Sequence, residues 1–151
     1  MNALSIFAGV CAFFSAATVG LWIKKRMIGK AAFYEQYYDY LLFVSEKIAY
    51  ERMPLGELNA NYFKRKNGEF AAFLRGETLV SALKTEEINE VRGFLDSIGK
   101  TDADTQISSL SAKCAELKRF TETECVKYRK DGALYFKLAA LLGVAAFILL
   151  V

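Results

Sequence analysis

The chain opens with an apolar stretch that stops at a cluster of positive charges. Residues 1–23 contain no charged side chain, and Lys24, Lys25 and Arg26 follow directly. A helix of this length, at about 1.5 Å per residue, covers about 34 Å and can cross a hydrocarbon core of about 30 Å. A secretory signal peptide, the competing interpretation, carries its positive charges before the apolar region rather than after it. The pattern therefore predicts a transmembrane helix over residues 1–23.

A second apolar stretch closes the sequence. From Gly132 to Val151 the only charged residue is Lys137, and the uncharged part after it has 14 residues. Alone, that part is too short to span a bilayer. Residues 132–136 complete a full crossing if the Lys137 amine snorkels back toward the headgroups. We therefore predict a second transmembrane helix over residues 132–151.

Basic residues flank both predicted spans on the side of the central region. They are Lys24, Lys25, Arg26 and Lys30 after the first span, and Lys127, Arg129 and Lys130 before the second. Because Lys and Arg are enriched in cytoplasmic flanks, residues 24–131 are expected in the cytoplasm and the N-terminus outside. The chain is thus expected in the cell membrane, with lipid as a partner.

The central region shows apolar positions at helical spacing and no alternating strand pattern. Helices are predicted over 31–52, from Pro54 through Tyr62, over 85–98, and from Thr101 or Asp102 to Phe120. Pro54 suits the first position of a helix, and Gly99 suits the left-handed position that ends one. The predicted fold is all-α, with N- and C-terminal transmembrane helices flanking a small cytoplasmic helical bundle.

Each long central helix has an expected buried stripe. The stripes are Tyr34, Tyr37, Tyr38, Leu41, Ser45, Ile48 and Ala49, then Ile88, Val91, Leu95 and Ile98, then Ile107, Leu110, Cys114 and Leu117. The tyrosines suit either core packing or an interfacial belt. Thr85, followed by Glu86 and Glu87, is expected to cap its helix. Beyond Phe120 charged residues replace the stripe, which is typical of a solvated stalk leading back to the membrane.

Small residues recur every four positions in the first span. They are Ala8, Ala12, Ala16 and Gly20. Such a face allows another helix backbone to approach closely. It is interpreted either as a docking face for the second span or another subunit, or as ordinary span composition.

Composition narrows the chemistry. The net charge of the chain is +3. Residues 24–131 hold 19 basic and 17 acidic residues, so they have no large surplus of positive charge of the kind that binds nucleic acid. Histidine is absent, which removes the commonest general base and most zinc ligand sets. Cys114 and Cys125 lie about 16 Å apart along a helix, too far for a disulfide. No phosphate loop, CxxC pair, HExxH or nucleophile elbow is found. The sequence predicts no enzyme, metal site or cofactor.

Three stretches resemble the stage III sporulation protein AB family of endospore-forming bacteria. They are "IAYERMPLGEL" at Ile48–Leu58, "FLDSIGKTDADTQ" at Phe94–Gln106 and "KYRKDGALYFKLAALLGVAAFILLV" at Lys127–Val151. Tyr50, Pro54, Leu55 and Glu57 stand at the first family pattern, and Gly99, Asp102 and Gln106 at the second. The resemblance implies a mother-cell membrane protein whose helical bundle is similar to the platform protein of type II secretion systems.

The resemblance also implies a non-enzymatic role in a channel-like complex between mother cell and forespore. A neighbouring secretion-type ATPase and other channel subunits would be the partners. Glu57, Asp102 and Gln106 are candidate partner-binding residues. The favoured interpretation is structural, because a helix cap at Asp102 and first-turn roles for Gln106 and Glu57 are each physically sufficient. Two other functions remain open: a small pore-forming or holin-like membrane protein, and a membrane anchor for an unrelated cytosolic enzyme.

Overall fold

The computed structural model describes residues 3–51, 57–60, 62, 68–77 and 82–150. Within these residues the chain is helical and contains no strand, so the all-α prediction is confirmed. The chain forms two compact units, which we call the hairpin unit (Met1–Ile28 with Val126–Val151) and the core unit (Gly29–Cys125). The boundaries predicted for the membrane spans, at residues 23 and 132, stay predictions.

Helix α1, Ala3–Glu51, has 49 residues and contributes to both units. The sequence pattern predicted a span over residues 1–23 and an amphipathic helix over residues 31–52 that leads out of the membrane. The helix continues through the basic residues between the two parts because no proline occurs there and Lys and Arg are good helix formers. Pro54, the expected start of the next helix, lies outside the described residues, whereas residues 57–60 and Tyr62 are helical.

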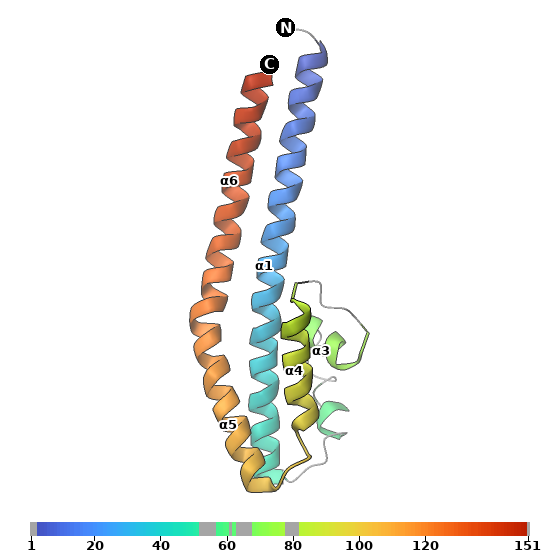
Figure 1. Ribbon diagram of the computed structural model, residues 1–151, viewed down its shortest axis with the longest axis vertical. Coiled ribbons are helices and arrows are strands. Elements are labelled where there is room, and N and C mark those ends of the chain that lie inside the picture. The colour runs from blue at the N-terminus through green and yellow to red at the C-terminus, as the bar shows by residue number, and fades with distance from the viewer. Residues whose placement is uncertain (1–2, 52–56, 61, 63–67, 78–81, 151) are drawn as a thin grey trace. The chain divides into compact units, whose positions relative to one another are not determined.

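Three further helices belong to the core unit: α3 (Glu69–Leu74), α4 (Thr85–Ser97) and α5 (Ala103–Phe120). A π-helical turn, η1 (Thr121–Cys125), leads from α5 into α6 (Val126–Leu150) of the hairpin unit (Figure 1). Gly76 and Gly99 follow α3 and α4 with φ angles of 74° and 88°. Only glycine adopts these left-handed values at little cost, which explains why both helices end there.

The start of α4 differs from the prediction. Thr85 is the first helical residue, and Lys84 is the N-cap. The Lys84 backbone N–H donates to Glu87 Oε2 at 2.9 Å, so a first-turn carboxylate satisfies this end of the helix. At α5 the N-cap is Asp102, whose carboxylate accepts from the Thr105 backbone N–H at 3.1 Å.

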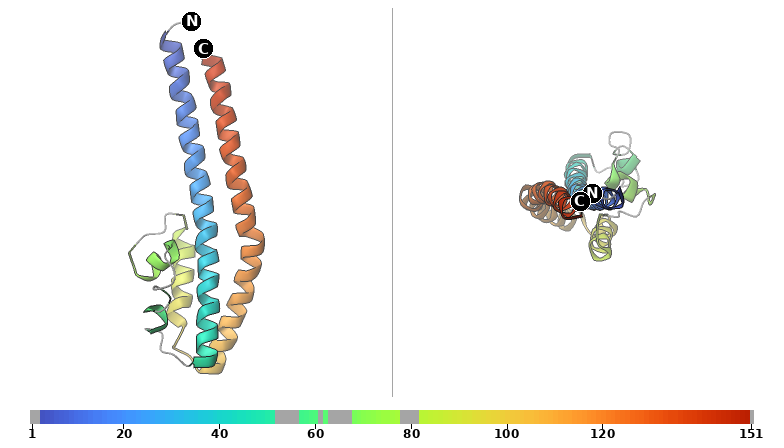
Figure 2. Two further views of the ribbon diagram at one scale, coloured as in Figure 1. Left: turned by 180° about the vertical axis from the view of Figure 1, so that it is seen from behind. Right: turned by 90° about the horizontal axis from the view of Figure 1, so that it is seen from above.

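The buried face of α1 in the core unit also differs from the predicted stripe. The fully buried residues are Phe33, Tyr37, Tyr40, Leu41 and Val44, while Tyr34 and Tyr38 are half-buried. This part of α1 lies between α5 on one side and α3 and α4 on the other (Figure 2). A helix that packs against neighbours on two sides buries a wide face. The apolar stripe in the sequence does not show which residues lie at the centre of that face. The tyrosines here serve core packing.

The core unit is built around aromatic rings. Phe70 of α3 is fully buried, and its ring centroid lies 5.2 Å from that of Phe33, 5.3 Å from Tyr37 and 5.4 Å from Tyr40. Val91, Ile98, Leu110 and Leu117 complete the core from α4, the residue after it, and α5. Ile107, predicted in the α5 stripe, is instead 38% exposed, while Gln106 beside it is buried. The buried face of α5 contains Leu110 and Leu117, as predicted, but in the first turn it is shifted by one residue, from Ile107 to Gln106.

The stalk predicted beyond Phe120 is corrected at one position. Cys125 is fully buried and counts among the core side chains, although Glu122 and Thr123 are exposed. The hydrogen bonds of a π-helical turn span five residues instead of four, so the turn is wider than in an α-helix and shifts which positions face inward. No disulfide joins cysteines among the described residues, and Cys11 is exposed while Cys114 is half-buried.

Candidate functional site

The hairpin unit carries the features of a membrane anchor. The helical stretches Leu4–Ile48 and Asp104–Leu150 each contain an 18-residue window apolar enough to cross a membrane, with mean hydropathy 2.0 and 2.2. Only 11% and 6% of these windows are buried, which distinguishes them from the core helix of a soluble protein. The exposed side chains include Phe7, Phe14, Trp22, Leu141, Leu142 and Ile148. Such large apolar surfaces are suited to lipid.

Within this unit, α6 runs beside the first part of α1, and the two chain ends lie at the same end of the pair (Figure 1). The two helices approach closely at Gly20, where an added Cβ atom would lie 2.7 Å from the Cβ of Ala139. A Cβ on Gly143 would be less crowded, at 3.1 Å from Phe13 Cδ2 and 3.3 Å from the Cβ of Ala16. The contact therefore depends on glycine, because a hydrogen in place of a methyl group lets the two backbones meet.

The four small residues predicted on one face of the first span have different surroundings. Gly20 is buried against α6, Ala16 and Ala12 are half-buried, and Ala8 is exposed. Near the N-terminus of α1 the buried small residue is Gly9 rather than Ala8. The face toward α6 thus follows spacings of three and four, as helix pairs with a slight crossing angle do, instead of a strict spacing of four.

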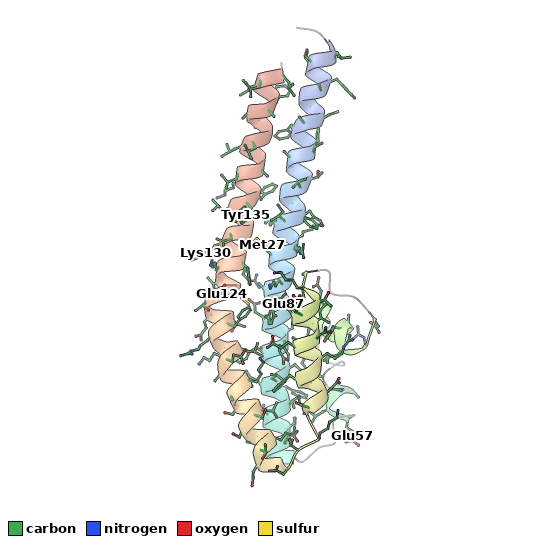
Figure 3. The ribbon with its side chains drawn as sticks, viewed as in Figure 1. Met27, Glu57, Glu87, Glu124, Lys130 and Tyr135 are labelled. Carbon is green, nitrogen blue, oxygen red and sulfur yellow. The ribbon has the colours of Figure 1, made fainter. Side chains whose placement is uncertain are left out.

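The matching face of α6 was not among the sequence predictions. It consists of Gly132, Phe136, Ala139 and Gly143, at spacings of four, three and four. A Cβ on Gly132 would lie 3.4 Å from Met27 Cβ, and Lys24 Nζ lies 5.3 Å from the Phe136 ring centroid. Figure 3 labels Met27 on α1 and Tyr135 on α6. The spacing of small residues predicted a packing face in the first span. The same search in the second span could have identified this face.

Two of the three candidate partner-binding residues share one helical turn, and the third comes from another segment of the chain. Asp102 and Gln106 share the first turn of α5, where the Gln106 backbone N–H donates to the Asp102 carbonyl at 3.0 Å. Glu57 belongs to the separate helical residues 57–60, and its side chain is exposed (Figure 3). The backbone N–H and the hydroxyl of Thr105 hold the pKa of Asp102 below its usual value. Asp102 is thus a helix cap with an exposed, ionised carboxylate, and Gln106 is a buried residue.

A partly buried ion pair joins α1 to α4 in the core unit. Lys30 Nζ donates to Glu87 Oε1 at 2.6 Å, and the two side chains are 17% and 25% exposed. Burial acts to raise the pKa of Glu87, but the hydrogen bonds from Lys30 and from the Lys84 backbone N–H hold it below its ordinary value. This pair was not predicted, since its members are 57 residues apart in the sequence.

Because the pKa of Glu87 is lower in the folded state, ionised Glu87 stabilises the fold above the ordinary value of 4.5, and this contribution disappears as pH falls through the lowered value. We expect Glu87→Gln to cost about 1.5–3 kcal/mol of stability at pH 7. We also expect it to flatten the loss of stability below pH 4.5. Chemical denaturation of the full chain in detergent at several pH values measures both effects. Glu86→Gln, an exposed neighbour in the same turn, is the control and should change neither.

The described residues contain no group of three or more His, Cys, Asp or Glu side chains placed to hold a metal ion. Their polar chemistry consists of helix caps, ion pairs and buried tyrosines. Tyr40 donates to Asn59 Oδ1 at 2.6 Å, and burial, followed by the nearby Tyr62, raises the pKa of Tyr40 to about 12. These are interactions that hold helices together.

The structure defines an all-helical protein that has a core unit and a pair of packed helices able to span a membrane. The family model described as stage III sporulation protein AB matches residues 75–151. The chain belongs to this family and is a membrane protein of sporulation. The matched residues include Gly99, Asp102 and Gln106, whereas Pro54 and Glu57 precede them. Comparison with curated proteins and with solved structures gave no match.

Proposed function

We propose that this chain is a non-enzymatic membrane platform in a secretion-like channel complex between mother cell and forespore, where it docks a secretion-type ATPase. The observation that carries the proposal is the family match over residues 75–151, which takes in α4, α5 and all of α6. The family is a structural component of sporulation rather than a known enzyme. A platform needs an anchor and a docking body, and the two compact units supply candidates for both.

The proposed orientation follows from charge. Lys24, Lys25 and Arg26 lie at one end of the first apolar stretch, and Lys127, Arg129 and Lys130 lie just before the second. Both clusters favour the cytoplasmic side, so the core unit would face the mother-cell cytoplasm, where the proposed ATPase would act. The chain passes between its units within helical segments, at Ile28–Gly29 and at Cys125–Val126. Helical connections suit a protein that positions or transmits movement.

A pore is less well supported. Two of the three hydroxyl groups of the first span are bonded to their own helix: Ser15 donates to the Cys11 carbonyl at 2.8 Å, and Thr18 to the Ser15 carbonyl at 2.8 Å. They therefore do not supply the free polar lining that ion conduction requires. Liposomes containing the full chain should accordingly retain a trapped fluorescent dye.

Binding to the ATPase encoded beside this chain is the direct test of docking. The full chain in lipid nanodiscs is expected to bind the purified ATPase, and charge reversal by Glu57→Lys should weaken binding at least tenfold, because a repulsive charge at a docking surface costs several kcal/mol. Asp102→Asn, which keeps an oxygen able to cap α5, should weaken it by severalfold. Biolayer interferometry gives both dissociation constants.

Glu46→Lys is the control for charge alone, since Glu46 is an acid on α1 outside the candidate set. Equal weakening by Glu46→Lys would indicate a nonspecific charge effect and contradict the assignment of Glu57. The absence of binding by the wild-type chain at high micromolar ATPase would overturn docking by this subunit alone.

A further inference from the structure

A cavity of about 190 Å³ lies within the core unit, among α1, α4 and α5. Aromatic side chains of Tyr34, Tyr37 and Phe120 form one wall, and the ring centroids of Tyr34 and Phe120 are 4.6 Å apart. The volume is below the 300–1,000 Å³ typical of drug-sized ligand sites, but it is enough for the end of one side chain. The cavity is separate from Glu57 and from the first turn of α5.

The inner wall holds an unsatisfied polar atom. Tyr37 is 1% exposed, and its hydroxyl oxygen has no hydrogen-bond partner among the described residues. Burial, followed by the charges of Glu90 and Glu116, raises the pKa of Tyr37, so the phenol stays protonated and can both donate and accept. A buried hydroxyl without a partner costs about 1–3 kcal/mol. Native structures contain few such groups, and Tyr37 is one of the residues that line the cavity, so an occupant that reaches this hydroxyl would supply the missing partner.

The charged side chains around the cavity indicate whether the occupant carries a positive or a negative charge. Glu87, Glu90 and Glu116 contribute three carboxylates, against one ammonium group from Lys113. Lys113 Nζ lies 3.1 Å from Glu90 Oε1 and 2.9 Å from Glu116 Oε1, so it is shared between two acids. Even when Lys30, the partner of Glu87, is counted, negative charge exceeds positive charge by one. This balance disfavours an anion and favours a cation.

Exposure shows how the occupant would enter. The side chains of Glu90 and Glu116 are 68% and 62% exposed, whereas Lys113 is 15% exposed and Tyr37 is buried. Carboxylates thus lie at the mouth, with an aromatic wall and a phenol behind them. A planar guanidinium suits this order, because it pairs with carboxylates through several N–H donors, stacks on aromatic rings and loses its hydration more readily than an ammonium group.

We propose that this cavity receives the arginine side chain of a partner protein, with Glu90 and Glu116 pairing with the guanidinium at the mouth and the Tyr37 hydroxyl accepting from it inside. The site goes beyond the platform role and does not depend on ATPase docking. Because Lys113 already holds the two carboxylates in place, the arginine completes an existing network.

The test uses the full chain in nanodiscs and N-acetyl-arginine-N-methylamide as the probe. The matched control probe is the citrulline analogue, which has nearly the same shape but no charge. We expect the arginine probe to bind at least tenfold more tightly than the citrulline probe in NMR titrations, with affinity that falls as salt is added. The double variant Glu90→Gln, Glu116→Gln should reduce this preference below threefold. Glu86→Gln, on α4 but outside the lining, should leave it unchanged.

Tyr37→Phe separates a ligand site from a structural cavity. If the phenol awaits an occupant, this variant should weaken binding of the arginine probe severalfold and raise the thermal midpoint without probe, because it removes an unsatisfied hydroxyl. If a buried water already satisfies the phenol, the variant should lower the midpoint and neither probe should bind. That result, or equal binding of arginine and citrulline probes, would overturn the proposal.

Discussion

Gly20→Ala is expected to destabilise the hairpin unit by about 1–3 kcal/mol, although alanine is normally the better helix residue. The added Cβ would lie 2.7 Å from Ala139 Cβ, well inside the 3.5–4.0 Å at which carbon atoms attract each other. Both groups are fixed to helix backbones, so the clash is relieved only if α1 and α6 move apart. Trp22 is the only tryptophan of the chain and lies in this unit, so its fluorescence reports unfolding of the hairpin in detergent.

The complementary change provides the decisive control. Ala139→Gly removes the methyl group that Gly20→Ala meets, so the double variant should recover most of the lost stability. Gly93→Ala tests the same substitution in open space, since a Cβ there has no neighbour within 4 Å. That variant should be neutral or stabilising by about 0.5–1 kcal/mol. Equal losses from Gly20→Ala with and without Ala139→Gly would contradict the close contact.

The sequence was sufficient for the two apolar helices because a membrane span is defined by length and by the absence of charge, both of which are local properties. It was less informative about which face of a span meets its neighbour. Ala8 fits a spacing of four as well as Gly20 does, yet Ala8 is exposed and Gly9 is buried. A one-residue difference of face depends on the crossing angle of two helices, which the sequence of one helix does not contain.

The core unit shows the same division between local and distant information. Helix ends were predictable where a single residue decides them, as at Asp102 and Gly99. The buried face was misplaced at Ile107, because polar Gln106 is buried and no pattern of apolar residues indicates that. Lys30 and Glu87, and the residues around Tyr37, come from helices far apart in the sequence. Only the packing of α1 against α4 and α5 brings them together.

Phe70→Ala is expected to cost about 3–5 kcal/mol of core-unit stability, the largest effect of any single change considered. Phe70 is fully buried on α3, a helix of six residues, which is too short to be stable without tertiary packing. Its ring lies within 5.2–5.4 Å, centroid to centroid, of Phe33, Tyr37 and Tyr40. Removal of the ring would leave a cavity among side chains that are themselves rigid, so the site cannot collapse to fill it.

The size of the effect can be measured by urea titration of the full chain in detergent, followed by the near-ultraviolet circular dichroism of the tyrosines. Leu42→Ala removes an apolar side chain from the same unit at a position that is 43% exposed, and should cost less than about 1 kcal/mol. Phe70→Leu should fall between the two, because it restores most of the volume without the ring contacts. If Phe70→Ala cost no more than Leu42→Ala, α3 would not be part of the core. The aromatic residues of α1 would then need another partner to account for their burial.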